Sequence, residues 1–400
     1  MFEATAEPKV FRDPVHGYIR VDLKVVWECI NSSWFQRLRR IRQLGGASMV
    51  YHCAEHTRFS HSLGVYEIVR RMVTEVADIR DSLSTEEKVI VMLAGLLHDI
   101  GHGPYSHSLE GVTGISHEVY TCRIIEEDTD VHAILERHKP GLAKEVADVI
   151  RHTSRHPLLS QLVSSQLDAD RMDYLLRDAY FTGTSYGQYD LERILRTLRV
   201  HDGETIVVKK SGVYAVENYI MARYHMYWQV YYHPVARSFE CLLHALFRRV
   251  KEVRDCELFS PLWQGMSLHD YFMLDEAYCS CGFGMLAHNG KDAVEKDLAE
   301  RIMDRRLFAY EDIEQEKAVR EAVSRAGLDP AYYVLQDAVS KHPYEPYGGM
   351  DEMIHVCMKD GAVKELSEAS ALVGSIIHAD SDDDRKVFFP KGILPHENGF

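Results

Sequence analysis

The 400-residue sequence contains no apolar run long enough to cross a bilayer, and no stretch after Met1 in which basic residues precede an apolar segment. A membrane-spanning helix needs about 20 consecutive apolar residues, and a secretory signal needs a charged segment before an apolar one. The sequence also lacks an internal repeat and a long low-complexity linker. We therefore expect a cytoplasmic globular protein without membrane association, built as roughly two to three domains or as one helical body with a smaller appendage.

Paired cysteines are also absent. The eight cysteines are scattered along a chain in which we expect no export signal, and Cys279 and Cys281 lack a second pair at the spacing of a structural zinc site. We therefore expect free thiols rather than a disulfide framework.

Positively charged residues are fewer than negatively charged ones. The sequence has 46 Lys and Arg residues and 61 Asp and Glu residues, which gives a formal net charge of −15. Non-specific binding to nucleic acid depends on basic residues that neutralise phosphates, so nucleic acid is not an expected partner. One basic cluster fits a site for a small polyanion such as a nucleotide phosphate, and equally a solvated basic helix face. The cluster consists of Arg37, Arg39, Arg40 and Arg42.

The hydrophobic pattern predicts a mainly α protein with small β-hairpins. Prolines and a glycine among apolar residues indicate one hairpin over residues 8–22. A second hairpin is expected over residues 204–216, turning at Ser211 and Gly212.

The second part of the chain has a weaker pattern, in which glycines and prolines interrupt mixed helix and strand signals. We expect one core domain over residues 1–255, including the N-terminal hairpin. Residues 256–400 are expected to form a mixed α+β region that packs on the core and takes part in oligomerisation.

Two expected helices bring ionisable groups into the core. A helical pattern that begins at Thr57 carries His61 in its first turns. A capping box at residues 84–87 opens a second helix that is apolar on all sides. Glycines and a proline follow, so this helix is expected to end at His98 and Asp99. Two ionisable groups at the end of a buried element require a compensating partner.

A third helix, expected over residues 168–183, places two carboxylates, two guanidinium groups and a phenol on one face. A later aromatic helix carries an arginine and two tyrosines at the same spacing of four, for which an aromatic stripe that packs a core is the alternative interpretation. These side chains are Asp170, Arg171, Tyr174, Arg177 and Asp178 in the first helix, and Arg223, Tyr227 and Tyr231 in the second.

The segment from His98 to His107 supplies three histidines and an aspartate within ten residues, broken by glycines that allow tight turns. Adjacent His and Asp residues at a helix end can bind one cation, because the backbone there lets neighbouring side chains converge. A mixed imidazole and carboxylate set suits a borderline divalent metal. Histidines that only form hydrogen bonds in the core are the alternative, which fits less well once His61 and Asp170 are added.

In the order and spacing of these motifs, the chain resembles the HD superfamily of phosphohydrolases, and within it the branch that cleaves deoxynucleoside triphosphates. The resemblance covers residues 9–250 and implies an HD-domain helical fold. The motifs that carry it are Asp13-Pro14-Val15-His16-Gly17, Phe35-Gln36-Arg37-Leu38-Arg39, Gln43-Leu44-Gly45, Arg58-Phe59-Ser60-His61-Ser62-Leu63-Gly64-Val65, the segment from His98 to His107, and Asp168-Ala169-Asp170-Arg171-Met172-Asp173-Tyr174.

The resemblance implies a metal site with His61, His98, Asp99 and Asp170 as ligands, and with open positions for water and a substrate phosphate oxygen. The expected cofactor is one divalent ion, Fe, Mn, Zn, Ni or Mg, and a second Mg²⁺ bound with the substrate triphosphate is compatible with the pattern. Such a cation would act as a Lewis acid on the α-phosphorus and lower the pKa of a bound water.

The resemblance also implies groups for proton transfer. His107 is the expected general acid for the leaving 5′-oxygen, with Glu110 three residues later orienting its imidazole. His117, which follows Ser116 at an expected helix start, matches a further catalytic histidine, although alone it also fits a surface histidine. His102 matches a histidine that contacts phosphate.

Three arginines match phosphate-binding positions of the family, namely Arg58, Arg171 and Arg223, whose planar guanidinium groups suit triphosphate oxygens. Arg171 is a departure, because the vertebrate members have lysine there. Tyr231 matches a residue near the nucleobase, and Tyr227 takes a position that is histidine in the vertebrate members. The base preference is therefore open.

Sugar contacts are implied for Tyr174 and Asp178, with Gln43 and Leu44 on the other side of the sugar. A phenol close to C2′ would exclude a ribose hydroxyl sterically, and Asp178 and Gln43 would bond the 3′-hydroxyl.

An effector site for a regulatory nucleotide is implied at a subunit interface, where Lys9, Gln36 and Arg39 match positions that read an effector. Asn31 replaces the aspartate that reads guanine in the vertebrate members, which weakens the expectation of GTP as the effector. The resemblance therefore implies an allosteric homo-oligomer, a dimer or a tetramer.

The expected activity is metal-dependent hydrolysis of a dNTP to a deoxynucleoside and inorganic triphosphate. An HD-type phosphodiesterase or phosphomonoesterase acting on other nucleotides is the alternative among enzymes, because the same metal ligands serve these reactions. A non-catalytic nucleotide sensor is the alternative from another class of protein.

Overall fold

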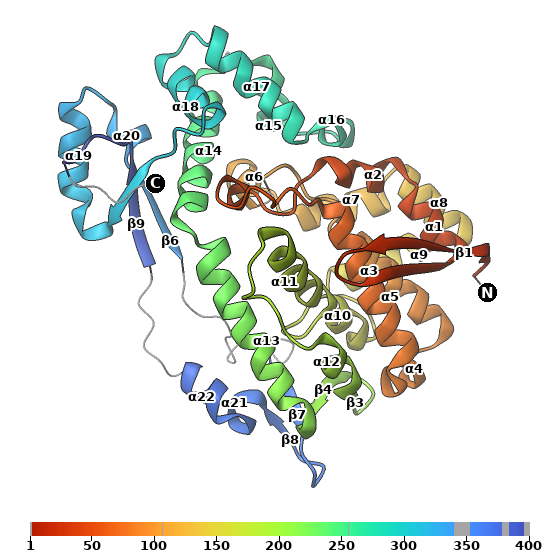
Figure 1. Cartoon of the computed structure of the whole chain (residues 1–400). Helices are drawn as coiled ribbons and strands as arrows, with labels where there is room; N and C mark the ends of the chain where they lie inside the picture. Colours follow the sequence, from red (N-terminus) through yellow and green to blue (C-terminus); the bar gives the residue numbers. More distant parts are fainter. Residues whose placement is uncertain (1, 106, 255, 340–352, 378–383, 396–400) are drawn as a thin grey trace.

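Helices form the body of the protein in the computed structural model, which describes residues 2–105, 107–254, 256–339, 353–377 and 384–395 (Figure 1). Within these residues, the strands form three small sheets at the edges of the helical body. The mainly α fold with small sheets that the pattern predicted is confirmed. None of the described helices combines the length and the apolar character that crossing a membrane requires.

The N-terminal hairpin forms as predicted, since β1 (Ala4–Asp13) pairs antiparallel with β2 (Gly17–Leu23). The second hairpin lies earlier in the chain than predicted, because β3 (Leu198–His201) pairs with β4 (Thr205–Lys209). Its turn contains Asp202 at φ 50° and Gly203 at φ 77°. Aspartate and glycine tolerate positive φ in tight hairpin turns. The predicted turn residues Ser211 and Gly212 instead lead into a helix.

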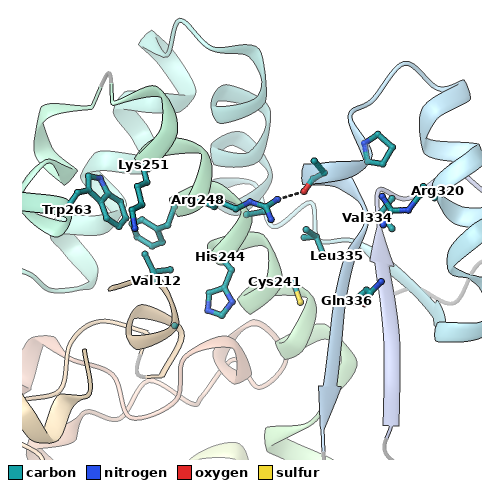
Figure 2. A pocket seen from close by; sticks show the side chains of 15 residues that line it. Val112, Cys241, His244, Arg248, Lys251, Trp263, Arg320, Val334, Leu335 and Gln336 are labelled. Atoms are coloured by element: carbon teal, nitrogen blue, oxygen red, sulfur yellow. Dashed lines mark hydrogen bonds between the residues drawn. The ribbon is translucent and has the colours of Figure 1, made fainter. Parts of the chain in front are cut away.

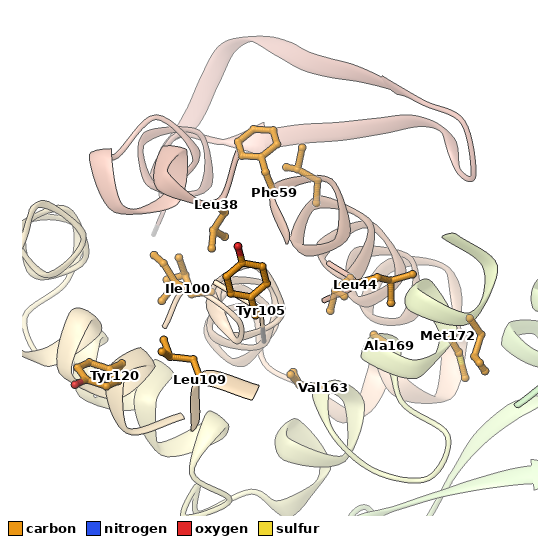
Figure 3. Close-up of a cluster of buried hydrophobic side chains, with 14 of the residues drawn as sticks. Leu38, Leu44, Phe59, Ile100, Tyr105, Leu109, Tyr120, Val163, Ala169 and Met172 are labelled. Atoms are coloured by element: carbon orange, nitrogen blue, oxygen red, sulfur yellow. The ribbon is translucent and has the colours of Figure 1, made fainter. Parts of the chain in front are cut away.

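Three helices position the site. They are α3 (Arg58–Glu75), α5 (Thr85–Leu97) and α11 (Ala169–Thr182). Helix α5 opens with the predicted capping box and is buried from Val89 to its end at Leu97, and α3 packs against both α5 and α11. Figure 3 shows side chains of α3, α11 and the segments before α3 and after α5 in one buried cluster. The apolar faces therefore bring the start of α3, the end of α5 and the start of α11 together.

The aromatic helix is α13 (Val213–Met226), and a π-helical segment, Tyr227–Tyr231, joins it to α14 (Pro234–Val253). The other helices are α1 (Lys24–Ile30), α2 (Ser33–Arg37), α4 (Ala77–Ser82), α6 (His107–Thr113), α7 (His117–Glu126), α8 (Asp130–His138), α9 (Leu142–Ile150), α10 (Pro157–Val163), α12 (Leu191–Thr197), α15 (Pro261–Gln264), α16 (Leu268–Met273), α17 (Glu276–Asn289), α18 (Ala293–Met303), α19 (Glu316–Arg325), α20 (Pro330–Tyr333), α21 (Leu366–Ala369) and α22 (Ala371–Ile377).

The later part of the chain is interlaced with the earlier part. Strand β7 (His355–Cys357) pairs parallel with β4 and antiparallel with β8 (Val363–Glu365). Strand β9 (Asp384–Phe389) lies between β5 (Ala309–Asp312) and β6 (Leu335–Val339), and pairs antiparallel with both. The expected division at residues 255 and 256 stays a prediction.

Candidate active site

The four predicted metal ligands meet at one point. His61 lies in the first turn of α3, His98 and Asp99 follow α5, and Asp170 lies in the first turn of α11. Nε2 of His61 lies 3.1 Å from Oδ1 of Asp170 and 3.6 Å from Oδ2 of Asp99. Nε2 of His98 lies 3.4 Å from Oδ1 of Asp99 and 3.7 Å from Oδ1 of Asp170. Two imidazoles and two carboxylates therefore surround a space of the size that one cation needs.

Both imidazoles are oriented by hydrogen-bond acceptors on the side of the ring that faces away from the metal group. Nδ1 of His61 lies 2.8 Å from Oδ2 of Asp173, and Nδ1 of His98 lies 2.9 Å from the carbonyl oxygen of Gly95. Each Nδ1–H thus donates to an acceptor, which directs the lone pair of Nε2 at the centre. Both Nε2 atoms are buried without a hydrogen-bond partner. Such atoms are rare unless they bind something, so this donor set fits a divalent metal.

Charge in the site also favours a cation. Burial lowers the pKa of His61, but the adjacent Asp170 and Asp173 carboxylates outweigh it and raise that pKa to about 10. Burial raises the pKa of Asp99, but the Arg58 guanidinium and then His98 hold it well below its usual range. The carboxylates therefore stay ionised and hold a proton on a ligand histidine. A metal that binds there must displace that proton.

Behind the metal group lies a buried network that sequence reasoning did not identify as functional. Besides His61, the Asp173 carboxylate contacts Nε2 of His16 at 2.6 Å and accepts from Nε of Arg177 at 2.8 Å. Arg177 also donates to Asp13 at 2.8 Å. A Cβ on Gly64 would overlap Oδ1 of Asp173. Glycine at this position therefore leaves room for the carboxylate. The i, i+4 spacing of Asp173 and Arg177 was the available signal.

A cleft of about 570 Å³ opens over the metal group. Its size suits a nucleotide. Most of the predicted substrate residues line it, and so do two of the metal ligands. These lining residues are Gln43, Leu44, Arg58, Asp99, Asp170, Tyr174, Asp178, Tyr227 and Tyr231.

Two predicted phosphate-binding arginines are not among the lining residues of this cleft. Nη1 of Arg171 donates to the carbonyl oxygen of Ser165 at 2.5 Å and also pairs with Asp168. Nη1 of Arg223 donates to Oε1 of Gln166 at 2.6 Å. Both guanidinium groups are thus bound to the segment that precedes α11.

Asp178 is fixed in the cleft by two partners. Its Oδ1 lies 2.7 Å from Nε2 of His56, and its Oδ2 accepts from the Tyr231 hydroxyl at 2.7 Å. His56, which sequence reasoning missed, stacks on Phe181 with ring centroids 4.5 Å apart. The edge of Tyr174 faces Tyr231 at 6.1 Å between centroids. Tyr174, Asp178 and Tyr231 therefore form one connected wall.

The predicted proton-transfer residues lie beside the metal group. His117 begins α7 with Ser116 as its N-cap, as expected, and its Nδ1 lies 2.6 Å from Oε1 of Glu110. His102 stacks on His117 with centroids 3.7 Å apart, and its Nε2 lies 3.4 Å from Oδ1 of Asp99. Glu110 thus orients His117. The side chain of His107 lies outside the described residues, so the predicted pairing of His107 with Glu110 stays a prediction.

The basic cluster of residues 37–42 does not form one surface, because Arg37 is separated from the exposed Arg39 and Arg40. Arg37 is buried and donates to the carbonyl oxygens of His102, Phe272 and Leu274, so the prediction of an anion site or a solvated face is wrong for Arg37. Arg40 pairs with Asp275 at 3.0 Å.

Two of the predicted effector residues contact Trp27, and the other two contact each other. Nζ of Lys9 lies 5.9 Å from the centre of the Trp27 ring, and Asn31 donates to the Trp27 carbonyl oxygen at 2.7 Å. Nε of Arg39 donates to Oε1 of Gln36 at 2.9 Å. Their role in binding an effector stays a prediction.

Glu276 links two segments that border the cleft. At the start of α17, its Oε1 accepts from the backbone N–H of Arg42 at 3.0 Å and of Tyr105 at 3.4 Å. Tyr105, which lines the cleft, has a positive φ of 58°. Burial raises the pKa of Glu276 to about 7.

The model of the HD domain matches residues 58–178, and the model of the HD associated region matches residues 189–391. The uncharacterised protein YwfO of Bacillus subtilis is 45% identical, over 97% of this chain and 94% of the relative. The crystal structure of a phosphohydrolase from Bacteroides thetaiotaomicron has a TM-score of 0.84 at 29% identity, and covers 96% of this chain and 100% of that chain.

More distant relatives carry a named activity. The deoxynucleoside triphosphate triphosphohydrolase SAMHD1 homolog of Dictyostelium discoideum is 28% identical, and the SAMHD1 enzyme of Danio rerio is 27% identical. These matches cover 62% and 61% of this chain, and 50% and 46% of the respective relatives. This chain therefore spans about half the length of these two enzymes.

Neutralising the carboxylate behind His61 should weaken metal binding without removing a ligand. In Asp173→Asn the His61 hydrogen bond can persist, but the negative charge that raises its basicity is lost. We expect metal affinity to fall roughly 10- to 100-fold, measured by titration against a chelator of known affinity. The exposed Asp81→Asn variant is the control and should bind metal like the original protein. Equal affinity in Asp173→Asn would show that the network does not tune the site.

Glu276→Gln should stabilise the protein at high pH. The pKa of about 7 in the folded state lies above the ordinary 4.5. As the pH rises, the unfolded chain therefore loses the Glu276 proton before the folded protein does. The contribution of Glu276 to the free energy of unfolding then falls between about pH 4.5 and 7. We expect a gain of roughly 1–3 kcal/mol in the free energy of unfolding at pH 8, and little gain at pH 4.5.

Urea unfolding at the two pH values measures this difference. The control is Glu257→Gln, an exposed position of the same region. A gain that is equal at both pH values would contradict the assignment to Glu276 ionisation.

Proposed function

The chain belongs to the HD-domain family whose members carry the HD associated region, and within this family we propose that it is a metal-dependent dNTP triphosphohydrolase. The proposed reaction releases a deoxynucleoside and inorganic triphosphate. The observation that carries the proposal is one cleft of about 570 Å³ that joins the His/Asp metal group to a wall of tyrosines and Asp178. A metal group alone would serve any HD hydrolase, whereas the adjoining wall suits a nucleoside.

The phosphate end of the substrate is assigned to the metal side of the cleft. A divalent metal held by His61, His98, Asp99 and Asp170 would polarise the phosphorus and lower the pKa of an attacking water. Nη1 of Arg58 donates to Oδ2 of Asp99 at 2.5 Å, so its guanidinium stands beside the metal group. A planar guanidinium group in that position suits phosphate oxygens.

Proton transfer is assigned to the histidines next to Asp99. Glu110 accepts from Nδ1 of His117 and leaves Nε2 as the atom that can exchange a proton with the substrate. His102, stacked on His117, is assigned to phosphate contact. His107 remains the proposed general acid for the leaving 5′-oxygen, as the family resemblance implies.

The nucleoside end is assigned to the tyrosine wall. His56 and Tyr231 hold the Asp178 carboxylate still, and a carboxylate has acceptor positions beyond the two that they use. Asp178 can therefore accept from a 3′-hydroxyl, with Gln43 and Leu44 on the opposite side. The ring of Tyr174 is assigned to exclude a 2′-hydroxyl by its bulk.

Regulation belongs to the same proposal. We assign Lys9, Asn31, Gln36 and Arg39 to a nucleotide effector site between subunits of a homo-oligomer. The support is the family resemblance, the contact of Lys9 and Asn31 with the same residue, Trp27, and the hydrogen bond between Arg39 and Gln36.

Incubation of the purified protein with each dNTP and Mn²⁺ or Mg²⁺ should yield inorganic triphosphate, identified by ³¹P NMR. Asp170→Asn is expected to lose turnover, because it removes a ligand charge. Orthophosphate released from monophosphates only would favour the phosphomonoesterase instead. Nucleotide binding without turnover under any divalent metal, unchanged in His117→Ala, would favour the sensor.

Shortening the side chain at Tyr174 should relax discrimination between sugars. We expect the ratio of kcat/KM for dGTP over GTP to fall at least about tenfold in Tyr174→Ala, because a ribose hydroxyl then fits. Tyr174→Phe keeps the ring and should keep the ratio. Equal loss in both variants would point to the hydroxyl rather than to the bulk.

A further inference from the structure

A second cleft of about 560 Å³ lies along α14 (Figure 2). One wall is α14 with Val112 of α6 and Trp263 of α15. The other wall is formed by α19, α20 and the start of β6. Its volume nearly equals that of the active-site cleft, so it has room for a ligand of the same size.

The charge of this cleft is opposite to that of the protein. Arg248, Lys251 and Arg320 line it, and none of the described residues that line it is an aspartate or a glutamate. This composition stands out in a chain with a formal net charge of −15. A concave surface that carries cations only concentrates positive potential and attracts anions.

The cationic groups are spread along the length of the cleft. Arg248 and Lys251 stand three residues apart on α14. In Figure 2, Lys251 lies beside Trp263, Arg320 of α19 lies on the opposite side near Val334, and the side chain of Arg248 extends between them. Arg320 pairs with Glu316 of its own helix at 2.8 Å, and Arg248 donates to the carbonyl oxygen of Ala331. A guanidinium has five N–H donors, so each retains donors for phosphate oxygens.

An aromatic ring borders the same cations. Nζ of Lys251 lies 5.5 Å from the centre of the Trp263 ring. A ligand that carries both an anionic group and a flat ring can therefore bind lysine and arginine through the first and pack on tryptophan through the second. Phosphate alone would use only the cations.

We propose that this second cleft binds a nucleoside phosphate, with its phosphates at Arg248, Lys251 and Arg320 and its base against Trp263. The predicted effector residues Lys9, Asn31, Gln36 and Arg39 do not line it. Its connection to the active site is His244, which lines both clefts and contacts the carbonyl oxygen of Ser108 at 2.9 Å.

Isothermal titration with ATP in the presence of EDTA tests the site without depending on hydrolysis. The double variant Lys251→Glu/Arg320→Glu should lose at least tenfold in affinity for one class of sites. The matched control is Lys317→Glu, an exposed residue of α19 that does not line the cleft and undergoes the same charge reversal. Unchanged ATP binding in the double variant, or an equal loss in the control, would overturn the proposal.

Tripolyphosphate distinguishes a nucleotide from a free oligophosphate. Trp263→Leu should weaken ATP binding several-fold and leave tripolyphosphate binding unchanged. If tripolyphosphate binds as tightly as ATP and Trp263→Leu alters neither, the ligand is an oligophosphate and the nucleoside part of the proposal fails.

Photo-crosslinking of the unaltered protein with 8-azido-ATP locates the site independently of any variant. The proposal requires labelled peptides from residues 241–263 or 330–336. Labelling confined to peptides that line the active-site cleft would overturn it.

Discussion

Asp173 is the side chain on which the geometry of the metal group depends. Its buried carboxylate contacts His16 of the N-terminal hairpin turn, His61 of α3 and Arg177 of its own helix. One side chain thus fixes three elements relative to one another and sets the ring of a metal ligand. Removal of Arg177 would leave carboxylate charge uncompensated in a dry interior, which costs on the order of 3–5 kcal/mol. The site therefore exists as part of the core rather than as an addition to it.

Sequence signals that span only a few residues predicted the helix boundaries correctly. The capping box at Ser84 and the end of α5 before His98 were read correctly, and so were the limits of α11, from its N-cap at Asp168 to Gly183. These features depend on hydrophobic spacing and on caps within a few residues. His61, His98, Asp99 and Asp170 came together because each stands at the end of such a helix.

What the sequence did not reveal depends on partners far along the chain. His16 and Asp173 are 157 residues apart, and His56 and Asp178 are 122 residues apart. Arg37 looks like a surface arginine until carbonyl groups of the segment before α17 enclose it. A local pattern shows which residues are polar, but burial and pairing are decided by segments that the pattern does not connect.

Residues of both the HD domain and the HD associated region line the active-site cleft. All four proposed metal ligands lie within residues 58–178, whereas Tyr227, Tyr231 and Arg237 lie in the region that follows. Arg237 is only 2% exposed and lines the cleft, where it bonds Asp337 at 2.6 Å and Asp384 at 2.7 Å. These bonds tie α14 to strands β6 and β9, so the late part of the chain holds one wall of the cleft. Hydrolytic chemistry can then stay constant while this wall changes, which is how one metal group can serve different substrates.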